Sequence, residues 1–189
     1  MKTFDVFPFR RFDRILVSGP QRSGTRFVSV AIAHDLVLKR HHEPTNPEKT
    51  REGVVHCPGY SHCLDKLSND GTLVVWVKRN TEDVLKSMAR IQWEKWEQAE
   101  VRKLPKEYHG SPSCEMRYKH WLEVQRPNVE HWVEVDYDRM TDHPLWVSPE
   151  DRAAVGGFVS TQTDVKTKGA MLFERDREIV ENGGDMKIH

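Results

Sequence analysis

The sequence predicts an α/β fold of three layers, in which helices cover both faces of a mostly parallel central sheet. Two observations carry this prediction. The run TLVVWVKR (72–79) is continuous and rich in β-branched and aromatic residues, as in a strand that is buried on both faces. Short apolar runs alternate with segments of helical periodicity, which is typical of parallel sheets. No segment has the composition of a linker, so we expect residues 1–189 to form a single domain.

Four strands are expected from the apolar runs. They are residues 15–17 (ILV), 54–56 (VVH), 72–79 and 131–137 (HWVEVDY). Each run is short and lies close to turn-forming or polar residues, as strands of a central sheet do. Between the first two runs, the segment RHHEPTNPEKTREG (40–53) is polar and contains two prolines, so we expect a loop there.

Helices are expected between and after these strands. They are residues 25 to about 39, 60–67, 81 to about 103 and 113–125, with a short helix from Pro149. For the third helix, Asn80 or Thr81 can cap the N-terminus, and the acidic Glu82 and Asp83 fall in the first turn. Past residue 141 the pattern weakens into a charged, glycine-rich tail.

Composition restricts the classes of partner. The formal net charge is zero, so the chain has no general field that attracts nucleic acid or anionic membrane, and any anion site must be local. No apolar run approaches the length of a membrane span, and the first residues lack the apolar core of a secretory signal. Three cysteines without framework spacing predict reduced thiols and a cytoplasmic protein.

The stretch GPQRSGTRF, after the first expected strand, has the features of a phosphate-binding loop. Gly19 and Gly24 allow a tight turn and close approach of backbone N–H groups to an anion. The helix that begins near Thr25 points its positive end at the same place. Arg22 and the hydroxyl groups of Ser23 and Thr25 add donors. The lysine and following Ser or Thr of an NTP-binding loop are missing, which favours an anion neutralised by protein groups rather than by a metal ion.

Two further residues lie at the carboxyl ends of expected strands. His56 ends the second strand and Arg79 ends the third. Because ligands of open α/β sheets gather outside the carboxyl ends of the strands, we expect these residues to lie near the glycine-containing loop.

These segments resemble the nucleotide-binding segments of sulfotransferases that use PAPS (3′-phosphoadenosine 5′-phosphosulfate). In that family a basic residue precedes Ser-Gly-Thr or Gly-Gly-Thr, which implies that Arg22 contacts the 5′-phosphate and the oxygen that bridges to sulfate. The position of Phe27 is that of an aromatic residue that stacks on adenine. KRNTEDVLKSMARI resembles the 3′-phosphate-binding segment, whose Arg and Ser have the spacing of Arg79 and Ser87 (87 − 79 = 8). The implied nucleotide-binding residues are Gly19, Arg22, Ser23, Gly24, Thr25, Arg26, Phe27, Arg79 and Ser87.

The same resemblance implies two alternatives for the catalytic base, of which His56 is ranked first and Glu43 second, because a glutamate in a loop is more often simply solvated. VVHCPGY is similar to a family strand that ends in Lys-Thr-His-Leu-Pro, which places His56 on the base; on the heparan-type form, Lys-Thr-Pro-x-Tyr, His56 replaces a lysine near the transferred group. Glu43, in HHEP, lies in the stretch that carries the catalytic glutamate of the heparan-type branch. Arg22 would stabilise the negative charge that develops on the leaving phosphate.

The segment HCPGYSHC also allows a zinc site, but its ligand spacing matches no common finger or ribbon.

The resemblance implies a P-loop NTPase-like, sulfotransferase-like fold and transfer of a sulfuryl group from PAPS to a hydroxyl or amine. The acceptor would be a small molecule or a glycan, the nucleotide product would be PAP (adenosine 3′,5′-bisphosphate), and no metal ion would take part. The alternatives are a P-loop nucleotide-dependent kinase and a non-catalytic PAP-binding relic. The motifs fall within residues of about 12–145. The family's C-terminal Arg-Lys-Gly segment is not recognisable, and Lys168, in KTKGA, is its weak substitute.

Overall fold

A five-stranded sheet organises the part of the chain that the computed structural model describes, residues 12–36 and 38–142. The strands are β1 (Arg14–Ser18), β2 (Arg40–His42), β3 (Gly53–His56), β4 (Thr72–Lys78) and β5 (Trp132–Asp136). Their order is β2-β3-β1-β4-β5, and every neighbouring pair is parallel. The prediction of an α/β fold with a mostly parallel sheet is therefore confirmed for these residues.

The central strands β1 and β4 are buried on both faces because their sequences are continuously apolar. Successive side chains of a strand point to opposite faces of the sheet. Ile15 and Val75 accordingly belong to the core cluster that includes α2 residues, while Leu16 and Trp76 belong to the cluster on the other face. The ring of Trp76 stacks on Trp121 with centroids 4.9 Å apart.

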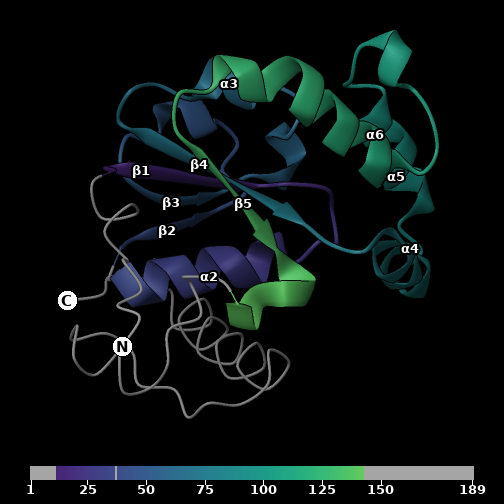
Figure 1. The fold of residues 1–189 in the computed structure, drawn as a ribbon, viewed down its shortest axis with the longest axis horizontal. Helices are drawn as coiled ribbons and strands as arrows, with labels where there is room; N and C mark the ends of the chain where they lie inside the picture. The colour runs from purple at the N-terminus through teal and green to yellow at the C-terminus, as the bar shows by residue number, and fades with distance from the viewer. Residues whose placement is uncertain (1–11, 37, 143–189) are drawn as a thin grey trace.

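Helices cover both faces of this sheet (Figure 1). α2 (Thr25–Leu36) lies along one face, and α3 (Leu64–Leu67) and α6 (Ser113–His120) lie toward the other. α4 (Thr81–Arg90) and α5 (Glu94–Val101) follow β4 at the side of the sheet. A π-helical turn, Trp121–Gln125, continues α6, and single 3₁₀ turns occupy Pro47–Lys49, Pro58–Tyr60, Lys106–Tyr108 and Arg126–Asn128. The segment Tyr137–Asp142 after β5 is 3₁₀-helical with a kink at Arg139.

The structure corrects the expected loop at residues 40–53. Its first three residues form β2, which pairs with β3 at the edge of the sheet. The sequence RHH has no apolar run because an edge strand of three residues is held by backbone pairing rather than by a buried apolar face. The pairing places His42 directly beside His56.

Two expected helices are shorter or broken. The helix from 81 to about 103 divides into α4 and α5, separated by a turn in which Gln92 has a φ of 53°. No glycine or proline marks this break. The expected helix at 60–67 is only α3, preceded by a 3₁₀ turn. Asn80 caps α4 as expected, because its side chain accepts hydrogen bonds from the amides of Glu82 and Asp83.

The connections between strands place the expected phosphate loop at a branching point of the sheet. The chain leaves β1 toward β2 and β3, whereas it leaves β4 toward β5. The carboxyl ends of β1 and β4 therefore flank the point at which the connections diverge, where α/β sheets hold their ligands. The expected helix from Pro149 and the candidate contact Lys168 lie outside the described residues. No helix of the described part of the chain is long and apolar enough to cross a membrane.

Candidate functional site

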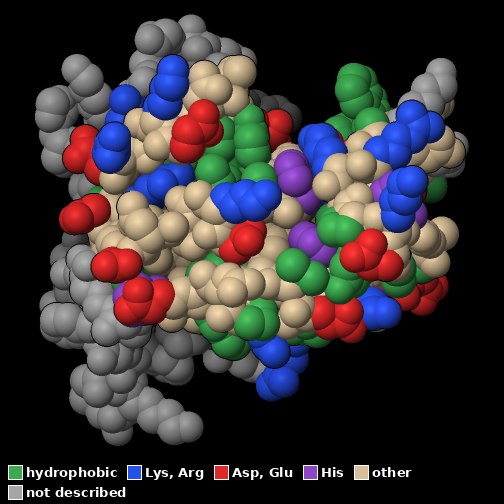
Figure 2. Space-filling model, turned by 90° about the horizontal axis from the view of Figure 1, so that it is seen from above, with side chains coloured by type: hydrophobic (Ala, Val, Ile, Leu, Met, Phe, Trp, Pro, Cys, Tyr) green, Lys and Arg blue, Asp and Glu red, His purple; other side chains and the backbone are tan. Residues whose placement is uncertain are grey.

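A pocket of about 560 Å³ opens at the carboxyl ends of the central strands. The structure brings together at this pocket most of the residues singled out from the sequence: Arg22, Gly24, Thr25, Arg26, Phe27, Glu43, His56, Arg79 and Ser87. The exceptions are Gly19 and Ser23. On the molecular face shown in Figure 2, basic and acidic side chains are interspersed, as expected for a chain whose anion site is local.

The loop after β1 has a backbone that only glycine can adopt at two positions. Gly19 has a φ of 147°, and a Cβ there would clash with the carbonyl oxygen of Val77 at the end of β4. Gly24 has a φ of 96°, and a Cβ there would clash with the ring of Tyr137. The two glycines therefore let the loop cross close to β4 and let an aromatic ring rest on the start of α2.

Other loop residues have different roles. Arg22 adopts a left-handed backbone with a φ of 67°, uncommon for a residue with a side chain and frequent at functional turns. Ser23 is fully buried, and its hydroxyl donates a hydrogen bond of 2.7 Å to the carbonyl of Pro20. In this arrangement the hydroxyl closes the loop on itself, and its contact with a ligand stays a prediction.

Phe27 does not offer the exposed ring face that stacking on adenine requires. Its side chain is 1% exposed and belongs to the core between the sheet and α2. It contacts Tyr137 edge-on, with centroids 5.8 Å apart. Only a small part of Phe27 therefore reaches the pocket, and Tyr137 is the more accessible aromatic residue of this wall.

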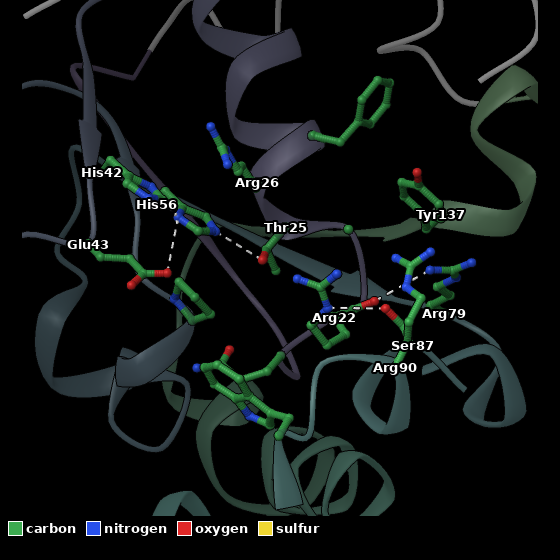
Figure 3. A pocket seen from close by; sticks show the side chains of 15 residues that line it. Arg22, Thr25, Arg26, His42, Glu43, His56, Arg79, Ser87, Arg90 and Tyr137 are labelled. Carbon is green, nitrogen blue, oxygen red and sulfur yellow. Dashed lines mark hydrogen bonds and ion pairs between the residues drawn. The ribbon is translucent and has the colours of Figure 1, made fainter. Parts of the chain in front are cut away.

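Three arginines gather at one end of the pocket (Figure 3). Arg22 Nε donates a hydrogen bond of 3.1 Å to Ser87 Oγ, and Arg79 donates one of 3.5 Å to the backbone carbonyl of Arg22. Burial, followed by the nearby charges of Arg90 and Arg79, lowers the pKa of Arg22. Arg79 also lies 5.0 Å from the centre of the Tyr137 ring. The group forms a concentration of positive charge around one hydroxyl, which suits a phosphate.

Asp138 is the carboxylate that forms an ion pair with Arg79 in the described structure. Its Oδ1 lies 3.5 Å from Arg79 Nε, and its Oδ2 accepts a hydrogen bond from the amide of Asn80. Within the described residues, no carboxylate forms an ion pair with Arg22 or Arg90. Three guanidinium groups thus face one carboxylate, and the excess positive charge is available to an anionic ligand.

A cluster of His42, Glu43 and His56 lies at the other end of the pocket (Figure 3). His42 Nδ1 and His56 Nδ1 are 3.0 Å apart, and His56 Nε2 lies 3.0 Å from Thr25 Oγ1. Glu43 Oε1 lies 3.7 Å from His56 Nδ1. Their exposure differs strongly, because His56 is 3% exposed and the Glu43 side chain 57%. Glu43 also has a left-handed backbone, with a φ of 44°.

A chain of polar contacts runs through His56. An Arg40 guanidinium nitrogen and His56 Nδ1 both lie within hydrogen-bond distance of His42 Nδ1, at 3.3 and 3.0 Å. On the other side of the ring, His56 Nε2 lies 3.0 Å from Thr25 Oγ1. Which atom of each histidine contact donates depends on the tautomers of the two rings. This chain of hydrogen bonds joins the edge strand to the first residue of α2.

The same cluster has the donor set of a metal site. One ligand atom from each of His42, Glu43 and His56 lies within 4.8 Å of the others, a spacing that two imidazoles and a carboxylate could use for a metal ion. The positive charge of Arg40 beside His42 opposes such an ion. Metal-independent chemistry therefore stays a prediction. Within the described residues, His62 and the cysteines of HCPGYSHC form no such group with His56, so the zinc site considered from the sequence does not assemble.

Sequence reasoning did not single out six residues that line the pocket: Gln21, His42, Pro58, Arg90, Trp93 and Tyr137. A signal existed for Arg90, which follows Ser87 by three positions on the same helix (90 − 87 = 3). His42 and Tyr137 gave no local signal, because His42 lies in a segment expected to be a loop and Tyr137 lies at the end of an expected strand.

Comparison with known proteins does not assign this chain to a family. A scan against family models and a search of curated proteins return no match. The resemblance to sulfotransferases therefore rests on the quoted segments alone.

Proposed function

We propose that this chain binds PAPS in a P-loop-type site and transfers its sulfuryl group to a hydroxyl or amine. The observation that carries the proposal is the order of groups along one pocket (Figure 3). Arg79 and Ser87 lie at one end, Arg22 and Thr25 lie between, and Glu43 and His56 lie at the other end. A 3′-phosphate, a 5′-phosphosulfate and an acceptor would need groups in this order.

The transfer itself would depend on position and charge. The acceptor oxygen or nitrogen attacks sulfur as the bond from sulfur to the 5′-phosphate oxygen breaks, and PAP leaves. Arg22 and the loop amides stabilise the charge that grows on the leaving phosphate, because such donors need no reorganisation during the reaction. A base removes the proton of the acceptor.

Of the two candidate bases, we assign the proton transfer to Glu43. Its side chain is 57% exposed and can meet an acceptor, whereas His56 is 3% exposed and is engaged through both ring nitrogens. His56 would position Thr25 on one side and Glu43 on the other. The sequence alone had favoured His56, and this assignment departs from that preference because of the difference in exposure.

The kinase alternative requires carboxylates or hydroxyls that hold Mg²⁺ beside the phosphates. Among the described residues that line the pocket, Glu43 is the one carboxylate, and it lies at the end opposite the arginines (Figure 3). This donor set favours a nucleotide whose charge is neutralised by arginine.

Calorimetric titration with PAP and with ATP tests the proposal, each with EDTA and with Mg²⁺. We expect PAP to bind in EDTA and more tightly than ATP in either buffer. Mg²⁺-dependent ATP binding of equal or greater strength would restore the kinase alternative. Turnover of PAPS is then measured on a panel of phenols, sugars and amines; tight PAP binding without turnover on any acceptor would favour the non-catalytic relic.

A further inference from the structure

We propose that Arg90 completes the 3′-phosphate subsite as a second guanidinium beside Arg79 and selects nucleotides that carry a phosphate dianion at the ribose 3′ position. The inference rests on the proposed function, because it assigns a role within the same nucleotide site. It adds a residue that neither the loop nor the pair Arg79 and Ser87 provides.

The position of Arg90 on α4 aims it at the pocket. Ser87 and Arg90 are three residues apart on α4, so they share one side of the helix, and both line the pocket. Val84 and Met88 are buried instead and pack in a separate core cluster with Cys114 of α6. The helix is therefore anchored by its apolar side and presents Ser87 and Arg90 to the ligand space.

The charges around Arg90 support the role. Arg90 is close enough to Arg22 that its charge, with that of Arg79, lowers the pKa of Arg22 beyond the effect of burial. Such repulsion is a cost to the free protein, and in the described structure Asp138 alone offsets it, through Arg79. A phosphate dianion removes the repulsion by placing about two negative charges among the three guanidiniums near pH 7.

A purely structural reason for Arg90 also exists and predicts a different result. It is the basic residue in the last turn of α4, where a positive charge interacts favourably with the helix dipole. That role needs only a charge at the helix end and would not distinguish one nucleotide from another. A phosphate-binding role needs the guanidinium fork and depends on the 3′-phosphate of the ligand.

The test is a cycle of ligand and residue deletions, followed by calorimetry. Wild type, Arg90→Ala and Arg90→Lys are titrated with PAP, adenosine 3′-phosphate and adenosine 5′-phosphate. Lys86→Ala is the matched control, because Lys86 is an exposed cation of the same helix that pairs with Glu82 and does not line the pocket. Thermal melts of all variants check that the fold is retained.

We expect Arg90→Ala to weaken the binding of PAP and of adenosine 3′-phosphate by roughly 10- to 100-fold, the scale of a charge-assisted hydrogen bond. The binding of adenosine 5′-phosphate should weaken by less than about threefold. Arg90→Lys should lose less affinity for PAP and adenosine 3′-phosphate than Arg90→Ala does, and Lys86→Ala should leave all three affinities unchanged. Equal losses for the 3′- and 5′-phosphates, or no loss for PAP, would overturn the assignment of Arg90 while the PAP site stands. A wild-type protein that does not prefer PAP to adenosine 5′-phosphate would overturn the nucleotide proposal itself.

Discussion

Arg22 Nε and Ser87 Oγ, 65 positions apart in the chain, are joined by a hydrogen bond of 3.1 Å. The bond connects the loop after β1 to α4, so the residues expected to hold the 5′- and 3′-phosphates already touch in the free protein. A ligand with both phosphates would have to enter between these side chains and replace their mutual contact with contacts to its own oxygens. The affinity for such a ligand should therefore depend on both Arg22 and Ser87.

Arg79→Ala should weaken PAP binding by about 2–4 kcal/mol, because the change removes one member of a partly desolvated charge pair. The preference for PAP over adenosine 5′-phosphate should be lost with it. Lys78→Ala is the control, since Lys78 is the preceding residue of the chain and its amine lies near Glu134 and Asp136 rather than in the pocket. If Arg79→Ala keeps the wild-type preference for the bisphosphate, Arg79 does not bind the 3′-phosphate.

Glu43→Gln should lower kcat for sulfuryl transfer by roughly 10²- to 10⁴-fold, the usual contribution of a positioned acid or base. PAP affinity should change little, because the base acts on the acceptor in the transition state. Glu48→Gln, an exposed carboxylate of the neighbouring 3₁₀ turn, serves as the control. Steady-state turnover and calorimetry on the same preparations separate the two effects.

His56→Asn is the companion variant to Glu43→Gln. It should lower kcat less than Glu43→Gln does and should also disturb PAP binding, because His56 Nε2 is hydrogen-bonded to the Thr25 hydroxyl of the loop. A variant with full PAP affinity and a larger loss of kcat than Glu43→Gln would return the base to His56. Unchanged turnover in both variants would refute this account of the chemistry even where the nucleotide site is correct.

Gly24→Ala should abolish measurable PAP binding and lower the free energy of unfolding by about 1–3 kcal/mol, the cost of a strained backbone conformation. The added Cβ meets the Tyr137 ring, and the φ of 96° is unfavourable for alanine. Gly59→Ala is the matched control, since a Cβ at Gly59 meets no atom within 4 Å. Denaturant titration and calorimetry measure both effects. A fully stable Gly24→Ala protein that binds PAP would contradict the described loop geometry.

Cys57 should make stability fall at alkaline pH. Burial raises the pKa of its thiol to about 12, above that of a thiol in the unfolded chain, so the unfolded state loses the proton first as pH rises. The contribution of the protonated thiol to the free energy of unfolding is complete below a pH of about 9. It is lost as the pH rises toward 12, at up to roughly 1.4 kcal/mol per pH unit. The free energy of unfolding should therefore fall less steeply with rising pH in Cys57→Ala than in wild type. Identical slopes would mean that the thiol is not protected in the folded state.

The central part of the fold could be read from the sequence because its signals are local. β1 and β4 are continuous apolar runs, and Asn80 has the side chain of a helix cap. β2 could not be predicted, because its three polar residues become a strand only through pairing with β3. The break between α4 and α5 likewise has no glycine or proline, and Gln92 adopts its left-handed backbone in the folded context.

The candidate site divides in the same way. Arg22, Arg79 and Ser87 belong to segments whose spacing is visible along the chain, and the structure places them in one pocket. The contact between His42 and His56 depends on the register of two parallel strands, and Tyr137 reaches Gly24 only because β5 lies beside β4. Contacts of this kind arise from tertiary structure, so no local sequence pattern predicts them.

If the proposed anion binds among Arg22, Arg79 and Arg90, the stability of the folded protein would depend on it. Like charges held together in the free chain favour unfolding, and an anion that joins the native state alone shifts the equilibrium back. At a ligand concentration 100 times its Kd this gain is about 2.7 kcal/mol, a large part of the stability of an ordinary domain. In a cell, the lifetime of the folded chain would then follow the supply of its nucleotide, and resistance to proteolysis would report whether the site is filled.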